Sequence, residues 1–414
     1  MSIVLFLSGC AISVGFVMKI GLTGFMDGGD MVGGESGEST SSDICRSGLN
    51  GFRKIKKIGF GTYGDIFMAI HRTTNKLLAL KKFRFNEEHH VGVPRSAVRE
   101  IRLLRELTGH VNIVDCYGLM VSTGNESNKD KGSLYMVLGF VDHDLVGLLE
   151  MHRRRLVLPE IKSIVAQTLN AIDYCHLHGI VHRDLKCANI LIDRAGVVKL
   201  ADFGLAREFC RDPLFDTKSG DDQENAFRMT NKVITIWYRP PELLLGATEY
   251  SWQVDMWSMG CILGELLLQK PLFSADEELR VLHMIMDELG PPQDSGLEYM
   301  RHLPLWKAFS RDMPPPSTGA GGLCKLESTV LHSCSRNSWD LIAKMLSFDP
   351  KTRIGAAAAL DHPFFTESPV ACAPIDIRLP MAGEFCHGLS MKEKRERERA
   401  AETATESNKR QKAI

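Results

Sequence analysis

The sequence has no excess of charge of either sign. Its 414 residues include 50 Lys and Arg against 51 Asp and Glu, which gives a formal net charge of −1. A protein that binds nucleic acid regardless of its sequence needs a broadly basic surface. We therefore expect no direct binding of nucleic acid by the chain as a whole.

Paired cysteines are also missing. The eleven cysteines are scattered and none forms a C-x-x-C pair, which argues against a disulfide framework and against a zinc knuckle. The pattern indicates free thiols in a reducing compartment. Cys175, Cys187 and Cys261 fall in segments that we interpret as core, or as loops beside it, where cysteine acts as a small hydrophobic residue.

After an apolar start, closely spaced apolar runs extend through the middle of the chain, from Phe52 to about Phe365. A body of this length suits two lobes that each bury a core. We expect the folded domain over residues 52–365, an N-terminal extension over residues 1–51, and a charged, disordered tail over residues 366–414.

The first 18 residues carry no charge, which allows two interpretations. One is a targeting segment or membrane anchor, although the run lacks a positive n-region and a clear cleavage site, and its length is at the lower limit for spanning. The other, which we favour, is translation from Met26 or Met31 followed by a disordered acidic leader rich in Gly and Ser.

The last 24 residues alternate in charge, with eight Lys and Arg against five Glu over residues 391–414. Such a run is typical of a solvated helix or a disordered tail. A second hypothesis is a split nuclear-import signal, formed by Lys392, Lys394, Arg395, Lys409, Arg410 and Lys412.

Three glycines near the start of the body, Gly59, Gly61 and Gly64, have G-x-G-x-x-G spacing. In a dinucleotide-binding loop this pattern would open a helix. Here a strand-like run, residues 65–70, follows instead. The pattern predicts a β-hairpin whose backbone can approach phosphate groups closely.

A lysine and a glutamate follow in the order that a nucleotide site needs. Lys81 stands near the end of a predicted strand over residues 77–83, and Glu100 lies in a helical pattern that begins near Pro94. If Glu100 faces that strand, its carboxylate can hold the Lys81 ammonium toward the α- and β-phosphates of a nucleotide. The alternative is an ordinary lysine at a sheet edge.

Residues 182–189 read His-Arg-Asp-Leu-Lys-Cys-Ala-Asn, and Asp202-Phe203-Gly204 follow after a short strand and a turn. With the glycine loop, Lys81 and Glu100 in chain order, this run resembles the signature of eukaryotic protein kinases in every element. The resemblance covers residues 52–365. It implies an α+β, bilobal kinase fold, with a small β-rich N-lobe over about 52–140, a larger, mainly helical C-lobe over about 141–365, and ATP between them.

The resemblance also implies protein serine/threonine kinase activity with ATP and Mg²⁺. Asp184 would accept the proton of the substrate hydroxyl, and Lys186 would contact the γ-phosphate. Asn189 and Asp202 would hold magnesium through hard oxygen ligands. The implied ATP-binding residues are Ile58, Gly59, Phe60, Gly61, Thr62, Tyr63, Gly64, Asp65, Ile66, Ala79, Lys81, Leu138, Gly139, Val141 and Asp144.

Residues 94–100, Pro-Arg-Ser-Ala-Val-Arg-Glu, resemble the PSTAIRE helix of cyclin-dependent kinases, which implies a cyclin partner at that helix. Residues 131–135, 142–149 and 230–235 are similar to the transcriptional branch, whose members phosphorylate the repeat tail of RNA polymerase II. This resemblance implies Ser/Thr-Pro sites as substrates and a nuclear location.

Two alternatives remain open, and the sequence argues against a third. One is a cell-cycle cyclin-dependent kinase, and another is a catalytically inactive scaffold that binds a cyclin. A mitogen-activated kinase would need a Thr-x-Tyr motif in the activation segment, residues 202–242, where this chain has Thr230-Asn231-Lys232.

Regulation follows from the same resemblance. Thr230 occupies the position of the activating threonine, which an upstream kinase would modify, and Arg99, Arg183 and Arg207 match the arginines that bind its phosphate. Two further candidate positions lie in the glycine loop. Thr62 and Tyr63 could take an inhibitory phosphate there, or merely pack and form local hydrogen bonds.

Further matches are structural. Glu242 and Arg353 are expected to form a buried ion pair, and Asp255 is expected to brace the catalytic loop. The chain departs from its relatives at the hinge residue Gly139, usually acidic, and at the gatekeeper position, Leu138, where phenylalanine is common. It also departs at Arg95, which leaves the identity of the cyclin open.

Overall fold

The computed structural model describes residues 44–45, 48–61, 64–83, 95–122, 133–151, 155–209, 234–311, 324–380 and 385–388. The chain forms two compact units. We call them the N-lobe unit, Met1–Thr108 with Val114–Phe140, and the C-lobe unit, Gly109–Ile113 with Val141–Ile414. Each is described by itself.

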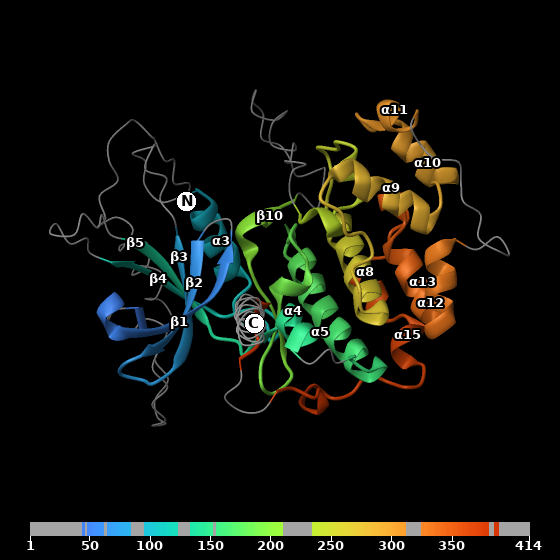
Figure 1. Cartoon of the computed structure of the whole chain (residues 1–414). Helices are drawn as coiled ribbons and strands as arrows, with labels where there is room; N and C mark the ends of the chain where they lie inside the picture. Colours follow the sequence, from blue (N-terminus) through green and yellow to red (C-terminus); the bar gives the residue numbers. More distant parts are fainter. Residues whose placement is uncertain are drawn as a thin grey trace, which may run out of the picture. The chain divides into compact units, whose positions relative to one another are not determined.

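The N-lobe unit is built on an antiparallel sheet of five strands in the order β1-β2-β3-β5-β4 (Figure 1). A short 3₁₀ turn, Leu49–Gly51, leads into the sheet, and the helix α3 contacts β4. The bounds are β1 Phe52–Gly61, β2 Gly64–His71, β3 Leu77–Phe83, α3 Arg95–Glu106, β4 Cys116–Ser122 and β5 Ser133–Gly139.

One face of this sheet is covered by residues that precede the expected domain. Because strand side chains alternate, Leu78 and Leu80 lie on the face of β3 opposite Lys81. Ile44, which is fully buried, packs against that face. The cluster consists of Ile44, Phe52, Ala69, Leu78, Leu80, Met120, Tyr135 and Val137, with Cys45, Leu49, Phe67 and Tyr117 at its margin. The folded part of the chain thus reaches back into the segment that we expected to be an N-terminal extension.

The first half of the C-lobe unit alternates helices with short strands. A three-stranded sheet has the order β6-β8-β9, and β7 pairs with β10. The bounds are β6 His143–Asp144, α4 Leu145–Met151, α5 Leu158–Leu177, β7 Ile180–Val181, η3 Cys187–Asn189, β8 Ile190–Ile192, β9 Val198–Leu200, η4 Phe203–Leu205 and β10 Arg207–Glu208.

The second half is helical. Its elements are η5 Ile236–Tyr238, α7 Pro241–Leu244, α8 Gln253–Leu268, α9 Glu278–Leu289, α10 Asp294–Arg301, α11 Trp306–Phe309, α12 Lys325–Ser333, α13 Arg336–Met345, η7 Pro350–Thr352, α14 Ala356–Leu360, α15 Pro363–Thr366 and η8 Pro374–Asp376.

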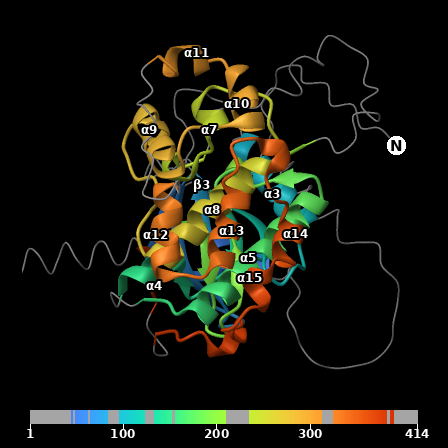
Figure 2. The ribbon, with the colours of Figure 1, turned by 90° about the vertical axis from the view of Figure 1, so that its right-hand side faces the viewer.

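The helix α8 is the centre of the C-lobe core. It packs against α5, α12 and α13 and lies among them in Figure 2. Most of its residues are buried, including Trp257, which suits a helix that is apolar on all sides. Within the described ranges, no helix is long and apolar enough to cross a membrane.

Residues 366–380 and 385–388 differ from the expected disordered tail, because they lie on the C-lobe unit. Lys162 donates to the Glu367 carbonyl at 2.9 Å, and the backbone and side chain of Arg378 donate to Glu160. The contacts come from backbone groups and from isolated side chains such as Ile377, which is 3% exposed. Such contacts leave no periodic apolar pattern, so the sequence offered no signal for them.

Candidate active site

In the N-lobe unit, Lys81 and Glu100 form the predicted pair. The Lys81 Nζ lies 2.6 Å from Oε1 of Glu100, and the two residues are 4% and 1% exposed. The strand β3 carries the lysine on the face opposite the Ile44 cluster, and α3 carries the glutamate. Charge-assisted hydrogen bonds of this kind are strong when they are shielded from water, so the ammonium is held in one place.

The glycine loop is a β-hairpin, as predicted. In the β1–β2 register Gly61 lies opposite Gly64, while Thr62 and Tyr63 lie outside the described residues. A Cβ added to Gly64 would lie 1.6 Å from the Lys82 carbonyl oxygen. No other residue fits there, because β2 and β3 run too close together at this point.

The other expected ATP-binding residues of the N-lobe unit lie on the same sheet. Ala79 is opposite Leu138 in the β3–β5 register, and the Gly139 N–H donates to the Asp115 carbonyl at 2.9 Å. Ile58, Gly59 and Phe60 belong to β1, and Asp65 and Ile66 belong to β2.

In the C-lobe unit, the carboxylate of Asp184 is held from three directions. Lys186 Nζ lies 2.7 Å from its Oδ2, Asn189 Nδ2 lies 2.7 Å from its backbone carbonyl and 3.2 Å from Oδ2, and Thr235 Oγ1 lies 3.3 Å from Oδ1. Asp184 is 6% exposed. Its orientation is therefore set by the catalytic loop together with Thr235, a residue 51 positions later.

The catalytic loop is anchored to α8 by Asp255, as predicted. The carboxylate of Asp255 accepts the backbone N–H groups of His182 and Arg183, each at 2.9 Å. His176 Nε2 lies 2.9 Å from the same carboxylate, a contact that sequence reasoning missed. Burial alone would raise the pKa of Asp255, but these hydrogen bonds and nearby histidines hold it below its usual 3.8.

Asp202 and Asn189 supply oxygen atoms of the kind that magnesium prefers. Asp202 has a left-handed backbone, with φ 63°, where the chain turns from β9 into Phe203. The Asn189 amide nitrogen donates to Asp184, so the side-chain carbonyl oxygen is the atom of Asn189 that could ligate a metal. Two residues supply few ligands, which suits an ion that nucleotide phosphates and water would also coordinate.

Asp144 contacts a segment that sequence reasoning did not associate with the site. Its Oδ1 accepts the Gly147 N–H at 2.7 Å, and its Oδ2 accepts the Gly388 N–H at 2.8 Å. The Asp144 N–H donates to the Cys386 carbonyl at 2.9 Å, and the Cys386 N–H donates to His143 Nδ1. Burial is the main cause of the lowered pKa of His143, which agrees with an imidazole that accepts a hydrogen bond. Val141, which is also expected at the nucleotide, precedes Asp144 by three positions and is buried.

Two of the three predicted phosphate-binding arginines lie in the C-lobe unit. Arg183 is 2% exposed, and its guanidinium donates to the Leu205 carbonyl and to the Tyr250 hydroxyl. Arg207 is exposed on β10, and Arg99 lies half-buried on α3 of the N-lobe unit. Thr230 lies outside the described residues.

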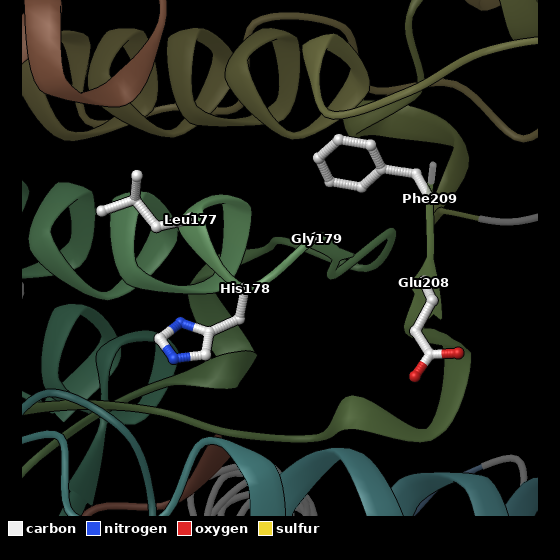
Figure 3. Close-up of a pocket in the computed structure, with 5 residues that line it drawn as sticks. All are labelled: Leu177, His178, Gly179, Glu208 and Phe209. Carbon is white, nitrogen blue, oxygen red and sulfur yellow. The ribbon is translucent and has the colours of Figure 1, made fainter. Parts of the chain in front are cut away.

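A shallow hollow of about 310 Å³ lies at the end of α5. Its walls are Leu177, His178, Gly179, Glu208 and Phe209, which come from α5, the turn after it, β10 and the residue that follows β10 (Figure 3). None of the predicted site residues lines it, so this hollow is separate from the catalytic loop.

The expected buried ion pair is present. Arg353 Nη1 and Nη2 lie 2.8 Å and 3.1 Å from the two carboxylate oxygens of Glu242, and both residues are almost fully buried. This pair connects the end of the activation segment to the last part of the C-lobe unit.

Comparison with known proteins identifies the family. The protein kinase domain family matches residues 52–365, so the chain belongs to the protein kinases. It is 40% identical over 369 residues to cyclin-dependent kinase C-1 of Oryza sativa subsp. japonica, covering 87% of this chain and 66% of that protein. It is 39% identical over 348 residues to cyclin-dependent kinase 12 of Drosophila melanogaster, covering 83% of this chain and 28% of that protein.

Among solved structures, the chain is similar to one from the yeast RNA Pol II CTD kinase CTDK-1 complex. The TM-score is 0.67 at 28% identity, with 84% of this chain and all of the other covered. The expected α+β kinase fold and the resemblance to transcriptional cyclin-dependent kinases are thereby confirmed. The chain spans about two thirds of the length of the rice relative and less than a third of the fruit-fly one.

Proposed function

We propose that this chain is a cyclin-dependent serine/threonine kinase that transfers the γ-phosphate of ATP to Ser/Thr-Pro sites. The observation that carries the proposal is the Asp184 carboxylate, which Lys186, Asn189 and Thr235 orient and which Asp255 supports through the loop backbone. A kinase site works mostly by positioning and by neutralising charge, and this arrangement does both.

In the proposed mechanism, Asp184 orients the substrate hydroxyl and accepts its proton. Lys186 contacts the γ-phosphate, and Lys81, held by Glu100, contacts the α- and β-phosphates. Asn189 and Asp202 hold magnesium, which neutralises charge on the phosphates when it is bound. Leu138, Gly139, Val141 and Asp144 bind the adenine and ribose of ATP.

The preference for proline after the acceptor is supported by Ile234. This β-branched residue has φ 66°, which such residues rarely adopt. The Ile234 carbonyl oxygen accepts a hydrogen bond from Nη2 of Arg239 at 2.9 Å. This oxygen is therefore turned away from a substrate backbone. A residue with an N–H would leave that group unpaired here, whereas proline has none to lose.

A cyclin is the proposed partner, and it would bind at residues 94–100. Within that segment Ala97 and Glu100 are buried in the N-lobe unit, while Val98 is 54% exposed and available for contact. Thr230 is the proposed activating phosphosite, with Arg99, Arg183 and Arg207 as its phosphate ligands. For Thr62 and Tyr63 we favour local packing and hydrogen bonding, with an inhibitory phosphate as the alternative.

The RNA polymerase II repeat is the proposed substrate and the nucleus the proposed location. The names of the relatives support both, because they include cyclin-dependent kinase 12 and an RNA Pol II CTD kinase complex. The proposed kinase domain over residues 52–365 is extended by Ile44 on its N-terminal side and by residues 366–380 and 385–388 on its C-terminal side, because these residues pack on the two units.

The test is phosphate transfer from ATP and magnesium to a Tyr-Ser-Pro-Thr-Ser-Pro-Ser repeat peptide. The protein is purified with its partner, and Asp184→Asn is the matched control, because it keeps the shape of the side chain and removes the charge. Transfer by the wild type, lost in the control, supports the proposal.

Two other outcomes would change it. Transfer to a histone-type Ser-Pro substrate, and not to the repeat peptide, would favour the cell-cycle branch. If a cyclin-bound, Thr230-phosphorylated sample modified neither peptide, the scaffold interpretation would replace the kinase.

A further inference from the structure

The side chain of Arg183 is held by two oxygen atoms inside the C-lobe unit. Its Nε donates to the Leu205 carbonyl at 2.8 Å, and its Nη1 donates to the Tyr250 hydroxyl at 2.9 Å. The backbone N–H of the same residue donates to Asp255, and its φ is 64°. Side chain and backbone are therefore both constrained at the residue that precedes Asp184.

Tyr250 reaches this position from the segment between α7 and α8. Burial raises the pKa of Tyr250, so the hydroxyl is neutral at physiological pH. The charge of Arg207 acts on both Tyr250 and Arg183. The hydroxyl thus lies in the electrostatic field of two of the arginines to which the proposed function assigns the Thr230 phosphate.

We propose that Tyr250 is a positioning residue that holds the Arg183 guanidinium, and with it the backbone of the catalytic loop, when no phosphate is present. The inference rests on the proposed kinase function. A buried guanidinium carries five N–H donors, and each one without an acceptor costs free energy. The neutral hydroxyl supplies one acceptor at all times.

A phosphate on Thr230 would supply stronger acceptors, because it carries up to two negative charges and three oxygens. Once the phosphate is bound to Arg183, the Tyr250 hydroxyl contributes less to holding the guanidinium. The kinase should therefore depend on Tyr250 most strongly in the unphosphorylated form.

The experiment compares the cyclin-bound full chain with its Tyr250→Phe variant, each in Thr230-phosphorylated and unphosphorylated form. In the unphosphorylated form we expect kcat to fall about tenfold, since the lost hydrogen bond is to a charged group. In the phosphorylated form we expect a fall of less than about threefold, since phosphate replaces the acceptor. The activation by phosphorylation is then larger in the variant than in the wild type.

Tyr174→Phe is the matched control. It removes the same hydroxyl from a ring that stacks between His110 and His178, at centroid distances of 4.4 Å and 4.2 Å. We expect the same activation ratio as in the wild type. The ratio is taken within each variant, so a change in the folded fraction cancels.

An equal loss of kcat in both forms of Tyr250→Phe, or no loss in either, overturns the inference and leaves the kinase function standing. A wild type that transfers phosphate but gains nothing from Thr230 phosphorylation overturns the phosphate assignment and this inference together. A wild type that transfers no phosphate overturns the proposed function itself.

Discussion

At the residue scale, the charged groups of this chain differ sharply in how far they are buried. Glu242 and Arg353 are a bidentate pair with side chains that are 1% and 0% exposed, and Arg353 also donates to the carbonyls of Ser347 and Gln253. Lys325, by contrast, pairs with Asp287 and Glu288 while it is 55% exposed. The two kinds of pair should contribute very different amounts to stability.

Removing one partner of the buried pair tests this difference. Arg353→Met should lower the free energy of unfolding by about 3–5 kcal/mol, because Glu242 is left as an uncompensated buried charge. Lys325→Met should cost less than about 1 kcal/mol, because water already screens its pairs. Chemical denaturation of both variants measures the costs, and equal losses would contradict the argument.

At the element scale, two irregular segments complete the lobes. The stretch 385–388 runs beside β6 and α4, where a Cβ on Gly147 would lie 2.6 Å from the Cys386 carbonyl oxygen and 2.9 Å from the His387 nitrogen. Ile44 completes the face of the N-lobe sheet opposite Lys81. Both segments are held by few residues, so single substitutions should release them.

Gly147→Ala should displace residues 385–388 from Asp144. The added methyl group meets backbone atoms that cannot rotate away, and such overpacking costs about 1–3 kcal/mol. Hydrogen exchange at the amides of Cys386 and Gly388 should become much faster. Gly355→Ala is a control for the substitution itself, since its φ is −81° and its added Cβ would meet only the Trp252 ring, at an ordinary contact distance of 3.7 Å. Unchanged protection in Gly147→Ala would show that the tail adapts.

Ile44→Ala should weaken the anchoring of the first described segment. It removes buried methyl groups from a site that is fully enclosed, and such changes cost about 2–5 kcal/mol when the cavity persists. Faster proteolysis near residues 44–51 would report the release. Ile55→Ala removes the same groups from a side chain that is 43% exposed, and it should have little effect. If both variants resist protease equally, Ile44 is not an anchor.

At the scale of the whole molecule, buried carboxyl groups set how stability depends on pH. The pKa of Asp255 is below 3.8 in the folded protein, because hydrogen bonds outweigh its burial. That of Asp340 is also lowered, mainly by Lys344, although it is well exposed. The pKa of Glu265 is raised above 4.5 by burial.

The signs of these shifts predict a stability maximum. A depressed carboxyl pKa means that the unfolded chain binds more protons, so Asp255 stabilises the fold above pH 3.8 and this is lost as pH falls further. Glu265 acts in the opposite sense, because its folded state favours the protonated form and stability is lost as pH rises above 4.5.

Urea unfolding from about pH 2.5 to about pH 7, a range that spans ordinary carboxyl pKa values, tests the roles of Asp255 and Glu265. Asp255→Asn should be less stable than wild type at neutral pH and should lose less on acidification. Glu265→Gln should remove the decline on the alkaline side. If Asp255→Asn loses as much unfolding free energy on acidification as the wild type, other carboxyl groups cause the loss.

Local sequence features predicted a large part of the site. Gly64, Lys81, Glu100, Asp184 and Asn189 were recognised because they occur together, in the chain order and at the spacings of the kinase signature. Other contacts of the site join residues far apart along the chain. Thr235 contacts Asp184 across 51 positions, His176 contacts Asp255 across 79, and Tyr250 contacts Arg183 across 67. No local pattern announces such a contact.

The sequence by itself determined the class of protein, the residue types of the catalytic loop and the alternation of strands and helices. Those properties depend on neighbours within a few positions, where periodicity and motif spacing act. Only the tertiary structure decided which side chains hold Asp184 and Arg183 in place, and how residues 44 and 385–388 complete the lobes. Those contacts depend on packing between segments that are distant along the chain. Burial there increases the contribution of each hydrogen bond and each methyl group to stability.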